Sequence, residues 1–590
     1  MKKKYFYTLL MLPLFLTGQV LPITSTEVSD LSAYGETTTY PGLGEYEIFL
    51  SADNILDKPI IVVDGFDPGD VRDIAGIYSL LDFTGTSGDD NLADLVRAQD
   101  FDVVILNFPE YLRLSDNSLL NIDNVADTNG DMIIDEADFP AGSTLVNGGA
   151  DFIERNAMIL VELLDVINTA KATNSPEQNV IIGPSMGGLI TRYALNYMES
   201  ENINTDTRLY ISFDVPHLGA NIPIGLQHQL NYLAFNDTNP VPEVQPIIDD
   251  LLRSPASRQL LIDHLDAHLA DGSLVEFNST LPEPHPFRVT FDSNINSLTT
   301  DGFPQGTRNI AIINGSGIGN PYFAMGDSGT TVSNGFTIIS TVIPVSVPTP
   351  FGNVDIDVEI DVNMTPAAGS PAQVSRFFAP IPVFPDVESI ASSERLNFDG
   401  VDAAPGGLFD ISALTGEITA GGDLAADFLA ALEIDKFSYI PAVSALALEI
   451  TNDDIDWFHN IDLAGRATTN NTPFDNTFLP DNNEPHVQLT QNNVTFALDE
   501  IFNPVLGISN NEKLQFKLEK NPIDNEIVLI SNNNSNATVN VIDITGKIVF
   551  SSTQVISNRT TIPVNLNSGF YLLNITSENN TSFAAKFLVK

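Results

Sequence analysis

The strongest chemical signal in the sequence is a serine flanked at two positions by glycine. Residues 179–195 run from a β-branched segment through Gly-Pro-Ser-Met-Gly into a segment with apolar residues at helical spacing. A Gly-x-Ser-x-Gly turn between a strand and a helix holds the serine hydroxyl clear of the sheet. The pattern predicts Ser185 as a nucleophile and the backbone N–H of Met186 as a donor to an oxyanion. The alternative is a tight strand–helix turn with an ordinary serine.

The segments around this motif read as buried strands and a helix. Continuous apolar runs lie at residues 59–63, 101–108 and 208–213. Such runs are typical of parallel strands that are covered on both faces of a sheet. Residues 157–169 carry apolar side chains three and four positions apart, which predicts a helix. The order of strand, helix, nucleophile strand, helix and strand predicts an α/β fold with a mostly parallel sheet.

This order of elements resembles the α/β-hydrolase fold of lipases and esterases. The resemblance covers residues 45–505, with large insertions, and includes a Pro-His-x-Gly turn at residues 216–219 that many lipase-like esterases carry. In such enzymes the loop after the strand at 59–63 supplies a second oxyanion N–H, and the matching residue here is Phe66. Asp64 stands where those enzymes commonly have a histidine.

The resemblance implies a serine hydrolase that works through a Ser-His-Asp triad and an acyl-enzyme, without an organic cofactor. The bond cleaved is foremost a carboxylic ester, which would belong to a lipid, an acylated polysaccharide or a polyester. Two other interpretations stay open. One is a peptidase or amidase on the same fold, and the other is a catalytically silent hydrolase-fold binding protein at the cell surface.

Seven histidines are candidates for the base of the triad. In the hydrolase order, the base follows all the core strands and precedes the last helix. His486 meets this condition, because residues 493–502 read as a closing helix. His459, which lies beside the only tryptophan, is the alternative base.

The acid of the triad has three candidates. The usual order places it after the strand at residues 309–316, yet no aspartate follows that strand immediately. Asp214 ends the preceding strand, a position from which some lipases supply their acid. Asp327 comes eleven residues after the later strand, and Asp435 precedes a segment similar to the Val-Pro-x-x-Ser that follows the acid in other lipases. Asp214 is the first choice, with Asp327 and Asp435 as alternatives.

An acidic loop at residues 123–150 contains a candidate calcium site. Oxygen ligands recur at positions 1, 3, 5, 9 and 12 of residues 127–138, as in dockerin and EF-hand loops. Met132 departs from the pattern, which has glycine at that position. The alternative is a solvated acidic insertion. The predicted structural Ca²⁺ ligands are Asp127, Asn129, Asp131, Asp135 and Asp138.

Two larger insertions follow the nucleophile. Residues 220–305 read as helices and lie where hydrolases often place a lid, and a plain helical cap is the alternative. Residues 316–435 contain β-rich segments, among them residues 354–363, where Val and Ile alternate with acidic side chains. A period of two places the carboxylates on one face of a strand, and we interpret that face as solvated.

Both ends of the chain carry targeting signals. Residues 1–19 join three lysines to a short apolar run and read as a signal peptide. Residues 513–590 contain alternating runs between Asn, Ser and Gly turns, which predicts a small antiparallel β sandwich. Motifs at 521–522, 542–547 and 586–590 resemble the C-terminal sorting domain of the type IX (Por) secretion system. The resemblance implies type IX machinery as a partner, export across the outer membrane, and release or attachment at the cell surface.

Composition excludes several classes of protein. The chain of 590 residues carries 77 Asp and Glu against 26 Lys and Arg, has a formal charge of −51 and contains no cysteine. This charge repels phosphate backbones, so nucleic acid is not an expected partner. The lack of cysteine excludes disulfides and thiol nucleophiles. No segment after the signal peptide has the roughly 20 apolar residues that a membrane span needs, so no span is predicted.

Overall fold

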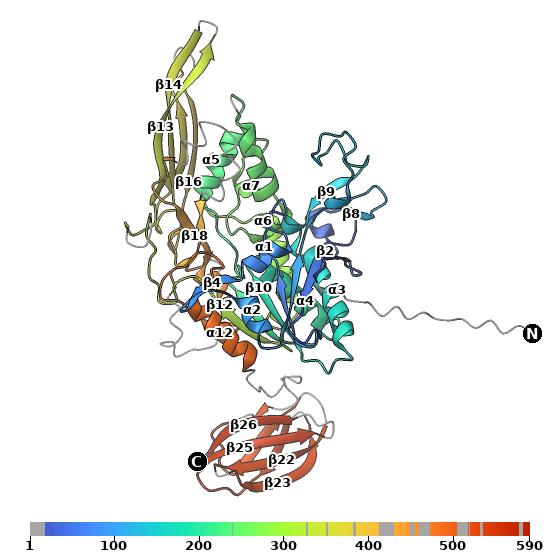
Figure 1. Ribbon diagram of the computed structural model, residues 1–590. Helices are drawn as coiled ribbons and strands as arrows, with labels where there is room; N and C mark the ends of the chain where they lie inside the picture. Colours follow the sequence, from blue (N-terminus) through green and yellow to red (C-terminus); the bar gives the residue numbers. More distant parts are fainter. Residues whose placement is uncertain are drawn as a thin grey trace, which may run out of the picture. The chain divides into compact units, whose positions relative to one another are not determined.

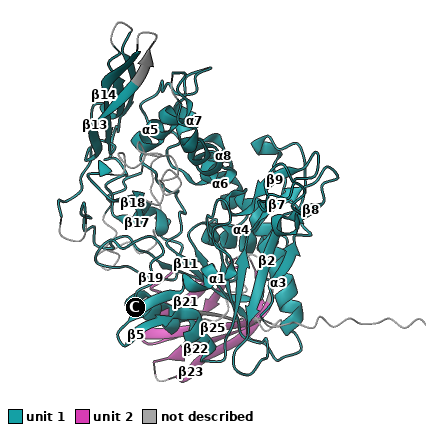
Figure 2. Cartoon of the chain, turned by 45° about the horizontal axis from the view of Figure 1, so that its top comes forward, with its two compact units in different colours: residues 1–503 teal, residues 504–590 magenta. Residues whose placement is uncertain are grey.

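The chain divides into two compact units, Met1–Asn503 and Pro504–Lys590 (Figure 2). The predicted signal peptide lies outside the described residues up to residue 17. Among the helices of the described part, none is long and apolar enough to cross a bilayer. The computed structural model describes residues 18–238, 240–325, 329–349, 352–381, 385–411, 430–448, 455–459, 472–503, 517–518, 520–531, 535–544, 546–557, 559–577 and 582–590.

The first unit is built on an eight-stranded sheet in the order β1-β2-β6-β3-β10-β11-β12-β19 (Figure 1). β2 runs antiparallel to both of its neighbours, and the strands from β6 to β19 are parallel. The mostly parallel sheet predicted from sequence is confirmed. Its strands are β1 (Leu21–Thr24), β2 (Leu43–Phe49), β3 (Pro59–Val63), β6 (Asp102–Asn107), β10 (Asn179–Pro184), β11 (Thr207–Phe213), β12 (Arg308–Ile312) and β19 (Asn476–Phe478).

The sheet begins earlier in the chain than the predicted domain boundary at residue 45. β1 and the start of β2 precede that boundary, and β1 pairs with β2 from Leu21 to Thr24. The physical reason is that β1 is an edge strand of four residues with only Ile23 buried. An edge strand lacks the continuous apolar run that marks the buried strands.

Helices cover both faces of this sheet. Neighbouring residues of β3 point to opposite faces, so Ile61 packs in the core with α3 and α4, whereas Ile60 packs in the core with α1, α2 and α12. This two-sided burial explains the continuous apolar runs of the central strands. The helices are α1 (Ile74–Ser79), α2 (Leu92–Arg97), α3 (Ile153–Lys171), α4 (Met186–Ser200) and α12 (Gln491–Phe502).

The helical insertion predicted at residues 220–305 packs on the β-rich insertion that follows it. Ile224 of α5 shares a small core with Val374 and Ala391 of the neighbouring sheet β13-β14-β15-β16. The elements are α5 (Ile224–Phe235), η4 (Pro242–Val244), η5 (Ile247–Leu252), α6 (Pro255–Leu260), α7 (Leu265–His268), α8 (Pro286–Ser297), β13 (Thr337–Thr349), β14 (Gly352–Asn363), β15 (Ala372–Ala379) and β16 (Val387–Ser393).

The alternating segment forms β14, which pairs with β13 in a long antiparallel hairpin (Figure 1). Its apolar residues Ile356, Val358, Ile360 and Val362 are buried. Asp355 and Asp357 are exposed, and Arg376 of β15 pairs with Glu359 and Glu388. The acidic face is therefore solvated and partly neutralised by one arginine.

Short elements complete the first unit. β17 of the second insertion pairs with β18, which directly follows that insertion and leads into α11. A three-stranded sheet of β7, β8 and β9 includes part of the acidic loop. These elements are η1 (Ser32–Tyr34), β4 (Asp82–Gly85), β5 (Gly88–Asn91), β7 (Glu110–Arg113), β8 (Leu119–Asn121), η2 (Ile122–Asn124), β9 (Thr144–Asn147), η3 (Gly148–Ala150), β17 (Gly406–Asp410), β18 (Lys436–Pro441) and α11 (Ala442–Ala445).

The second unit consists of two antiparallel sheets, β20-β21-β24 and β23-β22-β25-β26. Ile527 and Leu529 of the first sheet share one core with Val539, Val541 and Leu573 of the second. The predicted all-β sandwich is confirmed. Its strands are β20 (Lys517–Leu518), β21 (Glu526–Ile530), β22 (Ser535–Asp543), β23 (Ile548–Ile556), β24 (Arg559–Pro563), β25 (Gly569–Ser577) and β26 (Ser582–Val589).

Candidate active site

Ser185 lies in a sharp turn between β10 and α4, with φ 51° and ψ −132°. A residue other than glycine is strained at positive φ, and such strain clusters at functional sites. The turn needs glycine around it. A Cβ added at Gly183 would lie 2.5 Å from Gly188 Cα, and one added at Gly187 would lie 2.3 Å from the carbonyl oxygen of Val63. The three glycines therefore let helix and strands close tightly around the serine.

Three predicted site residues meet at this turn. His486 Nε2 lies 2.8 Å from Ser185 Oγ, and His486 Nδ1 lies 2.7 Å from Asp214 Oδ2. The side chain of Asp214 is fully buried, and that of His486 is 10% exposed. This is the arrangement in which an acid orients an imidazole and the imidazole accepts the proton of a serine hydroxyl.

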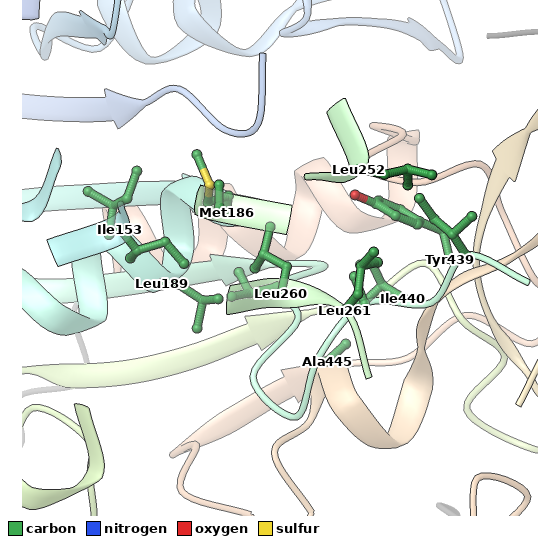
Figure 3. Close-up of a cluster of buried hydrophobic side chains, with 14 of the residues drawn as sticks. Ile153, Met186, Leu189, Leu252, Leu260, Leu261, Tyr439, Ile440 and Ala445 are labelled. Carbon is green, nitrogen blue, oxygen red and sulfur yellow. The ribbon is translucent and has the colours of Figure 1, made fainter. Parts of the chain in front are cut away.

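His486 follows β19 and is held by β17 of the second insertion and by β18, which directly follows that insertion. Its backbone N–H donates to the carbonyl oxygen of Leu408 in β17 at 2.8 Å. Tyr439 of β18 packs edge-on against the imidazole, with ring centroids 5.0 Å apart. Tyr439 belongs to the core that also contains Met186 and Leu260, shown in part in Figure 3. His486 is thus positioned by residues that lie 47 and 78 positions earlier in the chain.

Asp214 ends β11 and is fixed from two sides. Its Oδ1 accepts a hydrogen bond of 3.1 Å from the backbone N–H of Asn314, which follows β12. A Cβ added at Gly407 of β17 would lie 2.0 Å from Oδ2, so the backbone of β17 closes on the carboxylate. The contacts that Asn314, Gly407 and Tyr439 make with this site were not predicted from the sequence. For Asn314 the available signal was a polar residue directly after a buried strand.

Replacing Gly407 with alanine is expected to displace the Asp214 carboxylate and lower kcat about 100-fold, because misplacement by about 1 Å costs that much. Ester hydrolysis by the purified variant checks this. A matched control is Gly42→Ala, whose Cβ would lie 2.8 Å from Ile159 in a crowded place remote from the triad. The control is expected to lose stability and keep kcat. Equal losses of kcat in both variants would contradict the role given to Gly407.

The loop after β3 passes beside the nucleophile. A Cβ added at Gly65 would lie 3.3 Å from Ser185 Cβ and 3.7 Å from the backbone nitrogen of Met186. Met186 begins α4, so its N–H is one of the four that have no partner within the helix, and the helix dipole favours negative charge there. Phe66 follows Gly65 directly. Both predicted oxyanion donors therefore belong to backbone that adjoins Ser185.

Among the described residues, the structure does not bring the alternatives Asp435 and His459 to Ser185. Within the described part of the chain, Asp435 makes no hydrogen bond to His486, and its carbonyl oxygen accepts from the backbone N–H of Ile411. His459 closes a turn through its backbone N–H to Asp456 at 3.1 Å. Asp327 lies outside the described residues.

In the acidic loop, the carboxylates bind backbone N–H groups of the loop itself. Asp138 Oδ1 accepts from Thr128 N–H at 2.6 Å, and Asp127 accepts from Gly130 and Met132. Met132 has φ 68°, the left-handed conformation that glycine usually supplies. Among the described residues, no three His, Asp or Glu side chains are grouped to hold a metal ion.

The calcium site thus stays a prediction. Because an ion that binds the folded state stabilises it, we expect a chelator to lower the melting temperature if Asp127, Asn129, Asp131, Asp135 and Asp138 hold calcium. Differential scanning calorimetry with and without EDTA measures this. An unchanged melting temperature would contradict the prediction.

The tail shows where the protein goes. The family described as "Secretion system C-terminal sorting domain" matches residues 521–590. These residues are a type IX secretion sorting domain. The sorting domain directs the chain through the type IX system to the outer surface of the cell or the medium. The predicted localisation is therefore confirmed.

The first unit has the α/β-hydrolase fold, with the turn of Ser185 after the fifth strand of its sheet. A putative hydrolase from Agrobacterium vitis is 10% identical, with 50% of this chain and 78% of that chain covered and a TM-score of 0.23. Est1E from Butyrivibrio proteoclasticus is 9% identical, with 46% and 73% covered and a TM-score of 0.20.

A third solved structure matches a smaller part of the chain. Dimeric latent PorU from Porphyromonas gingivalis is 21% identical over 12% of this chain, with a TM-score of 0.11, and the match spans only 9% of the PorU chain. None of the curated proteins matches the chain.

Proposed function

We propose that the protein is a secreted serine hydrolase that cleaves carboxylic esters. The observation that carries the proposal is the continuous chain of hydrogen bonds from Ser185 through His486 to Asp214, at 2.8 and 2.7 Å, in a strained turn at the end of a central strand. A surface serine without function would not require a left-handed backbone, three close glycines and a buried acid behind its histidine.

The geometry supports the following sequence of steps. His486 Nε2 takes the proton of Ser185 as its Oγ attacks the ester carbonyl, and Asp214 holds the imidazole tautomer that has a proton on Nδ1. The N–H groups of Phe66 and Met186 stabilise the tetrahedral oxyanion. The imidazolium then gives its proton to the leaving alcohol. Water, activated by the same histidine, releases the acid from the acyl-enzyme.

Two experiments test the proposal. The purified protein is expected to hydrolyse p-nitrophenyl esters and to gain the mass of one phosphonyl group on Ser185 when treated with a fluorophosphonate. An active protein that cleaves p-nitroanilides faster than the matched esters would favour the amidase interpretation. A protein that shows neither hydrolysis nor labelling would favour the catalytically silent binding protein. A series of acyl chains from acetyl to palmitoyl separates lipid-like substrates from acylated polysaccharide and polyester models.

A further inference from the structure

We propose that Arg72 is a positioning residue that holds the oxyanion loop against Ser185. The inference rests on the proposed function and concerns how that site is kept in order. Arg72 Nη2 donates to the carbonyl oxygen of Phe66 at 2.9 Å and lies 3.3 and 3.4 Å from the two carboxylate oxygens of Asp64. One guanidinium group thus contacts both the residue that opens the loop and the predicted oxyanion donor.

The two ends of the loop are fixed by backbone hydrogen bonds. The N–H of Asp64 donates to Leu106 in β6 at 3.0 Å, and the N–H of Asp67 donates to Gly149 at 3.1 Å. Phe66 lies between these points and is held through its carbonyl by Arg72. A loop fixed at its ends but free in the middle would let the N–H of Phe66 move, so the arginine contact decides where this donor points.

Arg72 is itself fixed by the helix that follows it. Its backbone N–H donates to Asp67 Oδ2 at 2.8 Å, and the next residue, Asp73, caps α1 by accepting from Gly76 N–H at 2.7 Å. α1 is anchored in the core through Ile74 and Ile77, each 2% exposed. The guanidinium therefore connects the loop to a packed helix.

The charge on Asp64 completes the contact. Burial raises the pKa of Asp64 to about 6. The positive charge of Arg72 lowers this pKa, and the negative charge of Asp67 raises it further. On the facing strand β18, Tyr439 also lies within the field of Arg72, and its phenol is neutral in this range because burial raises its pKa to about 12. Above about pH 6 Asp64 is ionised and attracts Arg72. Below about pH 6 it is neutral and this attraction is lost.

The raised pKa of Asp64 lowers the stability of the folded chain at neutral pH. A carboxyl that holds its proton more tightly in the folded chain than in the unfolded chain makes the fold less stable as the pH rises from about 4 to about 6. The chain keeps this carboxylate although an asparagine of the same shape would avoid the cost. A buried charge retained beside a nucleophile is consistent with a role in the site.

Asp64→Asn tests the proposal, because it keeps the shape and removes the charge. We expect kcat for p-nitrophenyl acetate at pH 8 to fall about tenfold with KM nearly unchanged, since a misplaced donor weakens transition-state binding. The ratio of wild-type to variant kcat is expected to shrink toward one below pH 6, where wild-type Asp64 is also neutral.

A second readout is inhibition by phenylboronic acid, whose tetrahedral adduct with Ser185 places an oxygen in the oxyanion position. Its inhibition constant at pH 8 is expected to rise by the same factor as kcat falls. Glu500→Gln is the matched control. Glu500 is buried and pairs with Arg308 at 2.9 Å at the opposite end of the parallel strands, so this variant is expected to lose stability and keep kcat.

The outcomes distinguish the positioning role of Arg72 from the proposed serine hydrolase function. An active wild-type enzyme with a kcat ratio of one at pH 8, or a ratio that stays constant from pH 5 to 9, would overturn the positioning role alone. A wild-type protein that neither hydrolyses esters nor accepts a fluorophosphonate would overturn the proposed function, and the positioning role with it. Arg72→Lys adds a check that does not depend on Asp64, because lysine keeps the charge but lacks the planar fork, and kcat is expected to fall in this variant as well.

Discussion

Replacing Ser185 with alanine is expected to lower kcat for p-nitrophenyl esters about 10⁶-fold, the loss seen when the nucleophile of a Ser-His-Asp triad is removed. The physical reason is that the variant loses the hydroxyl whose Oγ lies 2.8 Å from His486 Nε2. Steady-state hydrolysis by the purified variant measures the loss, and fluorophosphonate labelling is expected to disappear with it. Circular dichroism should show an unchanged fold, because the side chain is small and partly exposed.

The chain offers a matched control for this variant. Ser212 Oγ lies 2.9 Å from His217 Nε2, which is a serine–histidine contact outside the triad. Burial and the nearby guanidinium of Arg192 hold the pKa of His217 well below its usual range, so this imidazole is a poor base. Ser212→Ala is therefore expected to keep kcat within about threefold of the wild type. A large loss in Ser212→Ala together with an active Ser185→Ala would show that the nucleophile is assigned wrongly.

Replacing Asp214 with asparagine is expected to lower kcat about 10⁴-fold while the fold stays intact. The amide cannot stabilise the imidazolium, and it favours the histidine tautomer with the proton on the wrong nitrogen. Asn314 donates to Oδ1, and this bond can persist with the amide oxygen of the variant. Fold and stability are expected to change much less than kcat, which thermal unfolding checks.

The same experiment decides among the three candidate acids. Asp435→Asn is the matched control, because Asp435 lies in the second insertion and does not contact His486 in the described part of the chain. Asp327→Asn tests the candidate that lies outside the described residues. Both variants are expected to retain kcat within about threefold of the wild type. A loss in either one that exceeds the loss in Asp214→Asn would transfer the role of the acid.

The nucleophile could be predicted from sequence because its signal is local. Strand, glycines, serine and helix fit within residues 179–195, and the positive φ of Ser185 follows from that turn. The position of His486 was also predictable, because few histidines exist and only one directly precedes the closing helix. The central strands were predictable for a related reason, since burial on both faces leaves a continuous apolar run in the sequence.

The sequence limited the acid of the triad to three candidate residues but did not distinguish among them. The choice depends on contacts between segments that are distant in the sequence. Asp214 is held by Asn314, 100 residues later, and by Gly407 in an insertion. The contacts of Arg72 could not be predicted for the same reason. A single arginine in a loop has no periodicity in the sequence, and only the folded loop brings it to Asp64 and Phe66.

The hydrogen bond from His486 to Leu408 makes the second insertion a support of the imidazole, and Tyr439 of β18, just after that insertion, packs on the same ring. Together with Gly407, these contacts make β17 and β18 part of the scaffold that keeps the base and the acid in register. Deleting residues 316–475 to make a smaller hydrolase would remove Gly407, Leu408 and Tyr439. These residues hold Asp214 and His486 in place. Removing the insertion is therefore expected to abolish catalysis as well.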